Sequence, residues 1–314
     1  MRTLNPELVA ALKRLKLSRI ADTLPERLVL ADKQDMPVED LLLLLLSDEI
    51  SRRDNSAAER RANDAKLDPK MRLELFDKSA KVSFDKHLLN ELVSLRFIEK
   101  HRHVVILGPV GVGKTFVATA LGHVACQHSY RVKFTRADAM LRSLRQGRFD
   151  SSRDDAMMSL LAVDLLILDD FAIEAMTKEE SKDVYQLFLE RTGSASMIIT
   201  SNRDTSEWLA MFDDMLLAQS AVDRVKNSAY DLVIDGESYR QAQTKARHRR
   251  RADASPGANG QNGSAIPHSS SALTGRRRVA HGPHWLHVPA KVCRARPNAT
   301  QIFPVDASPD LSHP

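Results

Sequence analysis

Short apolar runs alternate with longer amphipathic stretches through the middle of this chain. We expect strands at 103–107, 130–135, 163–170, 196–202 and 230–234, and helices at 86–99, 137–146, 178–191 and 206–226. The run 165–168 is continuously apolar, which is typical of a central parallel strand buried on both faces. Strands that alternate with helices predict an α/β fold, in which helices cover both faces of a parallel sheet. A ligand of such a sheet binds beyond the carboxyl ends of the strands.

The first 68 residues show a helical pattern instead. Residues 5–20 place Leu8, Leu12 and Leu15 on one helix face. Residues 38–50 are apolar on nearly every side, which predicts a buried core helix of a small bundle. Asp68 and Pro69 mark a boundary. We therefore predict a small N-terminal helical domain at 1–68 and a larger α/β domain at 69–246.

A mixed-charge helix is expected at 51–66, where arginines alternate with acidic residues. Its arginines are Arg52, Arg53, Arg60 and Arg61. A helix of this kind is usually a solvated face. The alternative is a surface that contacts the backbone of duplex DNA, because phosphate contacts need only exposed Lys or Arg side chains. The sequence leaves both interpretations open.

The last segment, 247–314, differs in composition from the rest. It holds eight of the 13 prolines, and its ten Lys+Arg against three Asp+Glu give a net charge of +7. The chain as a whole carries +5, so residues 1–246 carry −2. Few apolar residues recur periodically there, which predicts a disordered, basic and proline-rich tail. The basic character therefore belongs to the tail and is not evidence that the folded part binds nucleic acid.

Composition narrows the class of protein. Hydrophobic residues at 43% and charged residues at 28% are typical of a soluble globular chain. Two cysteines, Cys126 and Cys293, provide neither a disulfide framework nor zinc-ligand spacing. The N-terminus lacks a signal-peptide core, and the six leucines at 41–46 are too few to cross a bilayer. We expect a cytoplasmic protein without a membrane partner.

A glycine-rich loop between the first expected strand and a helix carries the strongest chemical signal. It reads Gly108, Pro109, Val110, Gly111, Val112, Gly113, Lys114 and Thr115, with Phe116 beginning the apolar part of the helix. Strand, G-x-x-x-x-G-K-T and helix together predict a phosphate-binding loop. Glycines let backbone N–H groups turn toward a phosphate, and the helix N-terminus adds its positive dipole end. Lys114 suits the β- and γ-phosphates, and the Thr115 hydroxyl suits Mg²⁺. A glycine turn that spells the motif by chance is the alternative.

Two further strand ends carry polar residues. Asp169 and Asp170 follow four apolar residues, where this type of fold places the acid that holds Mg²⁺. We assign the metal to Asp169, and the orientation of the attacking water to Asp170. Asn202 ends the next strand and is expected to face the γ-phosphate. A common asparagine turn is the alternative for Asn202.

These motifs together resemble the IstB-like ATP-binding proteins, which are helper ATPases of insertion-sequence transposases in the AAA+ class. The resemblance covers about residues 5–245. It is carried by the segments 108–115, 165–170, 199–202, 207–208, 222–224 and 236–240. It implies an AAA+-type P-loop NTPase fold, ATP and Mg²⁺ as cofactors, and ATP hydrolysis. It further implies that Asn202 is the sensor-1 residue, Arg224 an arginine finger that reaches a neighbouring subunit, and Arg240 the sensor-2 arginine.

The partners are also implied by this resemblance. They are duplex DNA with little sequence preference, the transposase of the same element, and further copies of the chain in the ATP state. AAA+ proteins usually have Glu where this chain has Asp170. Aspartate is one methylene shorter, so this difference affects the position of the attacking water and the hydrolysis rate. The tail beyond about Arg251 has no counterpart in the family.

Two other functions fit parts of the sequence. The family lies close to the DnaC helicase loaders, so a replicative helicase loader is the first alternative. A small-molecule P-loop kinase is the second, and it would need an acceptor pocket and an arginine-rich lid. That alternative explains neither Arg224 nor the N-terminal helices. The chain shows no zinc site, DDE triad or recombinase serine pattern, so we do not expect it to cut DNA itself.

Overall fold

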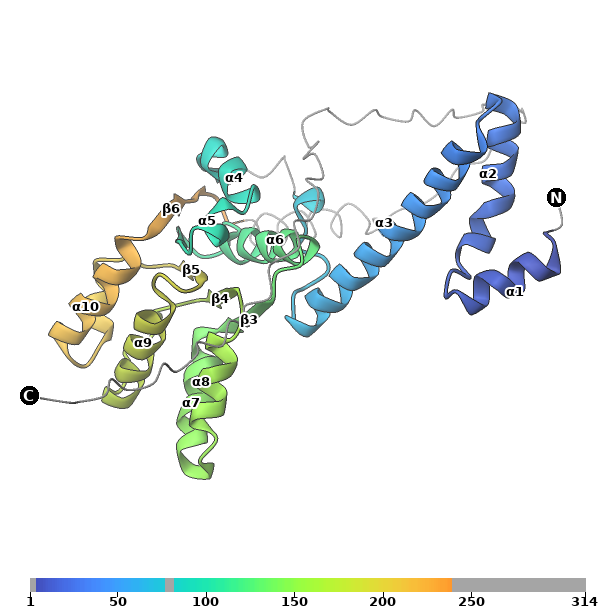
Figure 1. The fold of residues 1–314 in the computed structure, drawn as a ribbon. Helices are drawn as coiled ribbons and strands as arrows, with labels where there is room; N and C mark the ends of the chain where they lie inside the picture. Colours follow the sequence, from blue (N-terminus) through green and yellow to red (C-terminus); the bar gives the residue numbers. More distant parts are fainter. Residues whose placement is uncertain (1–3, 77–81, 239–314) are drawn as a thin grey trace, which may run out of the picture. The chain divides into compact units, whose positions relative to one another are not determined.

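The computed structural model describes residues 4–76 and 82–238 (Figure 1). The N-terminal helices are α1 Pro6–Arg14, α2 Ile20–Gln34 and α3 Val38–Asp64. The later helices are α4 Lys86–Val93, α5 Arg96–Glu99, α6 Lys114–Gln127, α7 Ala137–Asp150, α8 Arg153–Leu161, α9 Lys178–Arg191 and α10 Met215–Lys226, with short 3₁₀ helices η1 Leu73–Leu75 and η2 Glu207–Met211. The tail predicted to be disordered at 247–314 lies outside the described residues.

Five parallel strands form the central sheet in the order β3-β4-β5-β2-β6. Their bounds are β2 His103–Leu107, β3 Val132–Arg136, β4 Leu165–Asp169, β5 Ser196–Ser201 and β6 Ala229–Val233. Every residue of β2, β4 and β5 is buried, whereas β3 and β6 at the edges are partly exposed. The predicted parallel α/β fold is therefore confirmed, with each expected strand within two residues of its place.

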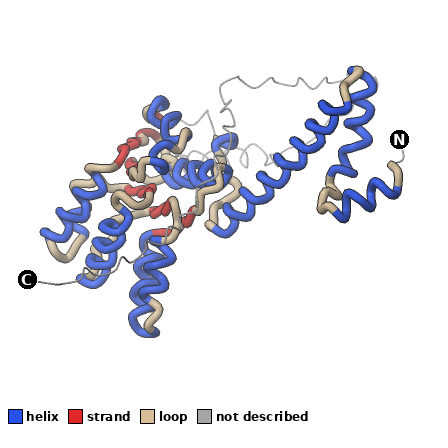
Figure 2. Tube along the Cα trace, in the orientation of Figure 1, coloured by secondary structure: helices blue, strands red, loops and turns tan. Residues whose placement is uncertain are grey.

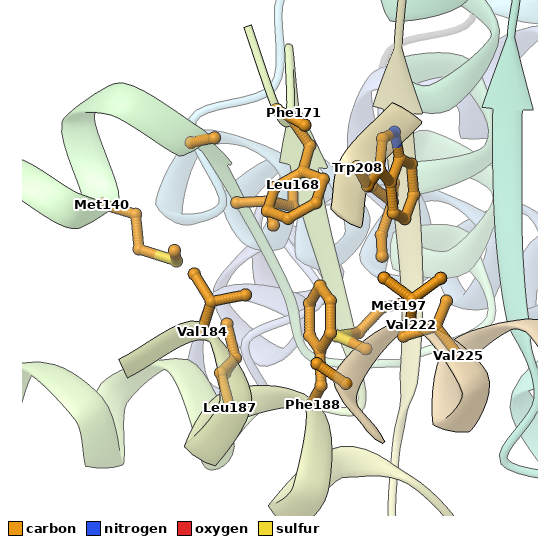
Figure 3. Close-up of a cluster of buried hydrophobic side chains, with 14 of the residues drawn as sticks. Met140, Leu168, Phe171, Val184, Leu187, Phe188, Met197, Trp208, Val222 and Val225 are labelled. Carbon is orange, nitrogen blue, oxygen red and sulfur yellow. The ribbon is translucent and has the colours of Figure 1, made fainter. Parts of the chain in front are cut away.

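Helices cover both faces of this sheet (Figure 2). One face packs against α7, α8, α9 and α10 in a core that includes Leu168, Phe171, Phe188 and Trp208 (Figure 3). The other face packs against α6 and against the C-terminal end of α3 and the residues that follow it, through Val104, Ile106, Leu121, Ile167 and Leu67. Strands with apolar side chains on both faces require helices on both sides, because neither face can be left in water.

Local chemistry fixes where several helices begin. The Asp85 carboxylate accepts hydrogen bonds from two N–H groups at the start of α4, and Asp214 does the same for α10. Thr177 and Glu180 form a reciprocal capping box at the start of α9. Such caps satisfy N–H groups that have no partner within the helix. The capping box explains why α9 begins at Lys178, as predicted from the sequence.

The N-terminal prediction needs two corrections. The helix expected at 5–20 ends at Arg14, and a turn separates it from α2. The helix expected to be buried at 38–50 is part of one continuous helix, α3, and most of its apolar side chains are exposed. Of the six leucines at 41–46, only Leu45 is fully buried, in a small cluster with Ile20 and Leu24 of α2. Since α2 covers a single side of α3, the other side faces solvent.

Three further differences concern the α/β region. The helix expected at 86–99 is interrupted at Leu95, whose left-handed conformation separates α4 from α5. The polar stretch at 147–155 contains the start of α8, which the sequence analysis missed. Val82–Ser83 and Asp235–Gly236 form a small antiparallel pair, β1 and β7, that was also not expected. Two-residue strands are too short to leave a periodic pattern.

The C-terminal half of α3 packs against α6. Ala62 and Leu67 belong to the same buried cluster as Leu121, and the Arg61 guanidinium donates to the Cys126 carbonyl at 2.8 Å. The division into domains at residue 68 stays a prediction. No helix in the described ranges is both long and apolar enough to span a membrane.

A buried histidine lies at the start of β2. His103 is fully buried, and its Nδ1 accepts a hydrogen bond from the Met197 N–H at 3.2 Å. Burial, with a smaller contribution from the nearby Arg191 guanidinium, lowers the pKa of His103 to about 4. Arg191 is itself buried and donates to the Leu160 and Ser196 carbonyls. His103 is therefore neutral in the folded protein.

Because His103 is buried and neutral, we expect the free energy of unfolding to fall at acidic pH. The unfolded chain takes up a proton near the ordinary histidine pKa of about 6.5, whereas the folded chain does so only near 4. The free energy of unfolding should therefore fall by about 3 kcal/mol as the pH drops from about 6.5 to 4. Urea unfolding at several pH values would measure this. His103→Gln should flatten the slope, and the exposed-site control His87→Gln should not; equal slopes in all three proteins would contradict the prediction.

Candidate functional site

The glycine loop joins β2 to α6 in conformations that favour glycine. Gly108, Gly111 and Gly113 have φ values of 146°, 87° and 104°. A Cβ on Gly108 would lie 2.0 Å from the Ile234 carbonyl oxygen, and one on Gly111 would lie 2.2 Å from Ser238 Oγ. Nothing lies within 4 Å of a Cβ built on Gly113. The first two glycines are required by contact and conformation, and the third by conformation alone.

Lys114 is the first residue of α6 and is almost completely buried. Its ammonium donates to the Gly108 and Pro109 carbonyls at 2.8 Å each, and to the Asn202 side-chain oxygen. The lysine therefore folds back over the loop toward the end of β5. The first N–H groups of α6, together with this charge, form an arrangement suited to an anion.

Asp169 ends β4 and is 4% exposed. Its carboxylate accepts hydrogen bonds from Thr115 Oγ1 at 2.9 Å and from Thr200 Oγ1 at 2.6 Å. Burial raises the pKa of Asp169, and these two hydrogen bonds oppose the rise. A buried carboxylate beside a hydroxyl is a donor set that suits Mg²⁺, which binds few carboxylates and otherwise takes phosphate and water oxygens. The residues predicted as metal ligands, Thr115 and Asp169, therefore lie in contact.

Asp170 lies immediately beyond the strand in a left-handed conformation, with φ of 56°. Its N–H donates to Thr200 Oγ1 at 3.0 Å, which turns the backbone at this point. Its carboxylate lies 3.6 Å from the Arg136 guanidinium at the end of β3. Arg136 also contacts Asp138 at 3.2 Å. Asp170 therefore faces the same region as Asp169 while paired with an arginine.

These residues line one cavity of about 680 Å³. Its polar lining includes Lys114, Thr115, Asp169, Asp170 and Asn202. Its apolar lining consists of Met71, Leu75, Phe76, Val82, Val110, Phe116, Phe134 and Ile173. The Phe76 ring makes edge contacts with Phe84 and Phe116 at centroid distances of 5.9 and 5.6 Å. A molecule that carries both charged and flat apolar groups would fit such a lining.

Some predicted residues differ in their place at the site. Val112 is buried and also lines the cavity, whereas Gly108 and Pro109 contribute their carbonyls to Lys114. Arg224, on α10, does not line the cavity, and its Nε is buried without a hydrogen-bond partner among the described residues. Arg240 lies outside the described residues.

The arginine cluster of α3 is largely engaged within the chain. Arg52 and Arg53 both bind Glu49, and Arg61 binds the Cys126 carbonyl. Arg52, Arg53 and Arg60 are all exposed. The solvated-face and DNA-contact interpretations both stay predictions for this cluster.

The sequence analysis missed two residues that shape the site. Thr200 joins Asp169 to Asp170 through its hydroxyl, and the signal was a polar residue inside the apolar run of β5. Arg136 pairs with Asp170, and it carried no signal because neighbouring arginines look alike in sequence. Behind them, the Trp208 indole N–H donates to Ser201 Oγ, which donates to the Phe171 carbonyl. These bonds hold the ends of β4 and β5 together.

Comparison with known proteins identifies close relatives. The family model of the IstB-like ATP binding protein matches residues 10–247. A protein of Mycobacterium tuberculosis (strain ATCC 25618 / H37Rv), described as an ATP-binding protein in an insertion sequence, is 37% identical over 238 residues, which are 75% of this chain and 94% of the relative. An ATP-binding protein of insertion sequence IS21 from Pseudomonas aeruginosa is 33% identical over 234 residues, which are 74% of this chain and 88% of the relative.

Solved structures give more distant likenesses, which concern the fold alone. The DnaC helicase loader is similar with a TM-score of 0.43 and 19% identity, over 47% of this chain and 86% of that one. The replication initiator DnaA, bound to AMPPCP and single-stranded DNA, has a TM-score of 0.46 and 23% identity, over 59% of this chain and 56% of that one. The family match begins within α1 and covers α2, α3 and the glycine loop. The resemblance expected from the sequence is confirmed, and the chain belongs to the family of IstB-like ATP binding proteins.

Proposed function

We propose that this protein is an ATP-dependent helper of an insertion-sequence transposase. It binds ATP with Mg²⁺, assembles with further copies on duplex DNA of little sequence preference, stimulates the transposase, and is reset by ATP hydrolysis. The observation that carries the proposal is the cavity in which Lys114, Thr115 and Asp169 converge at the start of α6. The names of its relatives, which are insertion-sequence proteins, support the biological setting.

The cavity suggests how the nucleotide lies. The phosphates lie beside Lys114 and Thr115, where N–H groups of the loop and of the α6 N-terminus would bind an anion. Lys114 exchanges its loop carbonyls for the β- and γ-phosphates. The base lies against the aromatic part of the lining, Phe76 and Phe116. A flat ring system gains from such burial and edge contacts.

Thr115 and Asp169 would hold Mg²⁺ between the loop and β4. The bound metal supplies positive charge that offsets the charge on the phosphate oxygens. Thr200 keeps the Asp169 carboxylate in place through its hydroxyl. Because burial raises the pKa of Asp169, a cation nearby favours its ionised form.

Asp170 is the group that orients the attacking water in this proposal. Its pairing with Arg136 holds the carboxylate to one side when no nucleotide is bound. Release from Arg136 would free the carboxylate to accept a hydrogen bond from water near the γ-phosphate. Asn202, which bonds Lys114, is positioned to report the presence of that phosphate. Arg136 is thus a positioning residue that acts through Asp170.

Arg224 would act on the nucleotide of a neighbouring subunit. It does not line its own cavity, and its buried Nε lacks a partner among the described residues. Arginine has the permanent charge and the fork geometry that phosphate oxygens need. ATP occupancy would in this way favour contact between subunits. Arg240 is proposed to contact the nucleotide within the same subunit, as the family's sensor-2 residue.

The roles of Asp170 and Arg136 can be separated by mutation. Asp170→Asn should leave ATP binding largely intact and slow hydrolysis about 100-fold or more, because water orientation is lost. Arg136→Ala should raise hydrolysis several-fold by freeing Asp170. The double variant should be as slow as Asp170→Asn alone. Steady-state phosphate release, with ATP affinity measured in parallel, tests all three.

Arg142→Ala is the matched control, since Arg142 also pairs with Asp138 but does not contact Asp170. Its hydrolysis rate should equal that of the unmodified protein. Two outcomes would mean that another residue orients the attacking water. One is a fully active Asp170→Asn variant, and the other is an Arg136→Ala/Asp170→Asn protein that hydrolyses ATP as fast as Arg136→Ala.

The proposed role of Arg224 can be tested by measuring assembly of the protein on DNA. With a non-hydrolysable ATP analogue, the unmodified protein should form larger assemblies on two duplexes of unrelated sequence. Arg224→Ala should bind the analogue, fail to grow beyond its nucleotide-free size, and hydrolyse ATP about 1,000-fold more slowly. Mixing it with Lys114→Ala should restore some activity, because one interface then pairs an intact loop with an intact arginine. Light scattering and phosphate release measure both effects.

Lys226→Ala provides the control, because Lys226 is exposed two residues further along α10. It should assemble and hydrolyse normally. An Arg224→Ala protein that assembles and turns over like the control would remove the arginine finger from the proposal.

A further inference from the structure

The chain returns to the glycine loop after the last strand of the central sheet. Ile234 follows β6, and its N–H donates to the carbonyl of the residue that ends β2 at 2.8 Å. The Ile234 carbonyl oxygen lies so close to Gly108 that a Cβ there would be only 2.0 Å away. Further along, Ser238 contacts the loop at Gly111. We call residues 234–238 the crossing segment.

The crossing segment is also attached to the wall of the cavity. Its two-residue strand β7 pairs antiparallel with β1, which places Gly236 opposite Val82. Val82 lines the cavity, and the nearby Phe84 ring makes an edge contact with Phe76, which lines it as well. The crossing segment therefore joins the glycine loop to a strand that forms part of the cavity wall.

Ser238 meets the loop at a point where the loop has no side chain of its own. A Cβ built on Gly111 would lie 2.2 Å from Ser238 Oγ and 3.1 Å from Ser238 Cβ. Gly111 lines the cavity, whereas Ser238 does not belong to its lining. The partly buried Ser238 side chain therefore packs on Gly111 from outside the cavity.

Gly113 provides a comparison within the same loop. Its φ of 104° is similar to the 87° of Gly111, and both glycines line the cavity. No atom of the described residues lies within 4 Å of a Cβ built on Gly113. The two glycines therefore share a backbone conformation, but they differ in that Ser238 packs against Gly111.

Such packing matters for a loop that binds an anion through its backbone. Glycine loses more conformational freedom than any other residue when the chain becomes ordered. Phosphate binding also needs several N–H groups that point toward one place. A contact that restricts the loop beforehand lowers the ordering cost of binding and so raises the affinity. Ser238 supplies a contact of this kind from a distant part of the chain.

We propose that Ser238 is a positioning residue for the nucleotide, which packs against Gly111 and holds the glycine loop in its phosphate-binding shape. The inference rests on the proposed ATP site, and it assigns no contact between Ser238 and the nucleotide itself. Because energetic coupling between two sites is reciprocal, phosphates bound in the loop also restrict the crossing segment.

Steady-state ATP hydrolysis by the full-length chain tests this role. Ser238→Gly removes the side chain, so it should raise KM for ATP about 10-fold while kcat changes less than about twofold, because the residues around the reacting phosphate keep their places. Ser238→Ala keeps the Cβ and should raise KM no more than about threefold. Direct measurement of ATP affinity should give the same order of variants.

Glu237→Gly is the matched control. Glu237 is the exposed neighbour of Ser238, so its replacement adds the same backbone freedom to the crossing segment without removing the contact with Gly111. This variant should keep the KM and kcat of the unmodified protein. Equal KM values for Ser238→Gly and Glu237→Gly would overturn the proposal.

Other roles of Ser238 give different results. A purely structural role would lower the fraction of folded protein, so Ser238→Gly would lower kcat and the thermal unfolding midpoint and leave KM unchanged. A hydroxyl that bound phosphate directly would make Ser238→Ala as weak as Ser238→Gly. Either result would contradict a role that depends on packing against the loop.

A pair of double variants isolates the contact between Ser238 and Gly111. Gly111→Ala should weaken ATP binding, because its backbone is strained and its Cβ overlaps Ser238 Oγ. Adding Ser238→Gly removes the overlapping atom and should restore affinity about fivefold, although Ser238→Gly alone weakens binding. Gly113→Ala has similar strain without the overlap, so Ser238→Gly should weaken this variant as it weakens the unmodified protein.

Equilibrium ATP binding to all of these proteins separates the two possible failures. If the unmodified protein binds no ATP, the proposed function fails and the role of Ser238 fails with it. If the unmodified protein binds ATP but Ser238→Gly acts alike on Gly111→Ala and Gly113→Ala, only the role of Ser238 is refuted. Recovery of Gly111→Ala together with further weakening of Gly113→Ala is the result that the proposal predicts.

Discussion

The Asp169 carboxylate is a charged group buried at the carboxyl end of a central strand. Such a group is costly unless it is hydrogen-bonded, and its two donors come from different elements, Thr115 on α6 and Thr200 on β5. Both contacts exist only if the phosphate-type loop, β4 and β5 end at the same height of the sheet. The same register brings Lys114 and Asn202 together. The geometry of the whole cavity therefore depends on how this one carboxylate is satisfied.

The sequence predicted the parts of this arrangement that are local. Central strands buried on both faces are continuously apolar, so β2, β4 and β5 could be placed from residue type alone. The loop motif fixed Lys114 and Thr115, because the residues that act together are adjacent in the chain. Contacts between distant segments could not be predicted in this way. Thr200 and Arg136 act through partners 31 and 34 residues away, and neither residue type is distinctive.

The helix expected at 38–50 shows a second limit of prediction from sequence. Apolar residues all round a helix indicate that the helix is covered, but the pattern does not say whether its own chain or another one covers it. Here α2 covers one side, and Leu42, Leu43 and Leu46 remain exposed.

Equilibrium binding of ATP to the full-length chain tests the central claim most directly. The unmodified protein should bind ATP in a Mg²⁺-dependent manner, and Lys114→Ala should lower the affinity or abolish binding, because it removes the buried side-chain charge of the loop. Lys178→Ala, at the exposed start of α9, should bind ATP normally. Absence of ATP binding by the unmodified protein, or equal affinity of Lys114→Ala and Lys178→Ala, would contradict the assignment of this cavity as the nucleotide site.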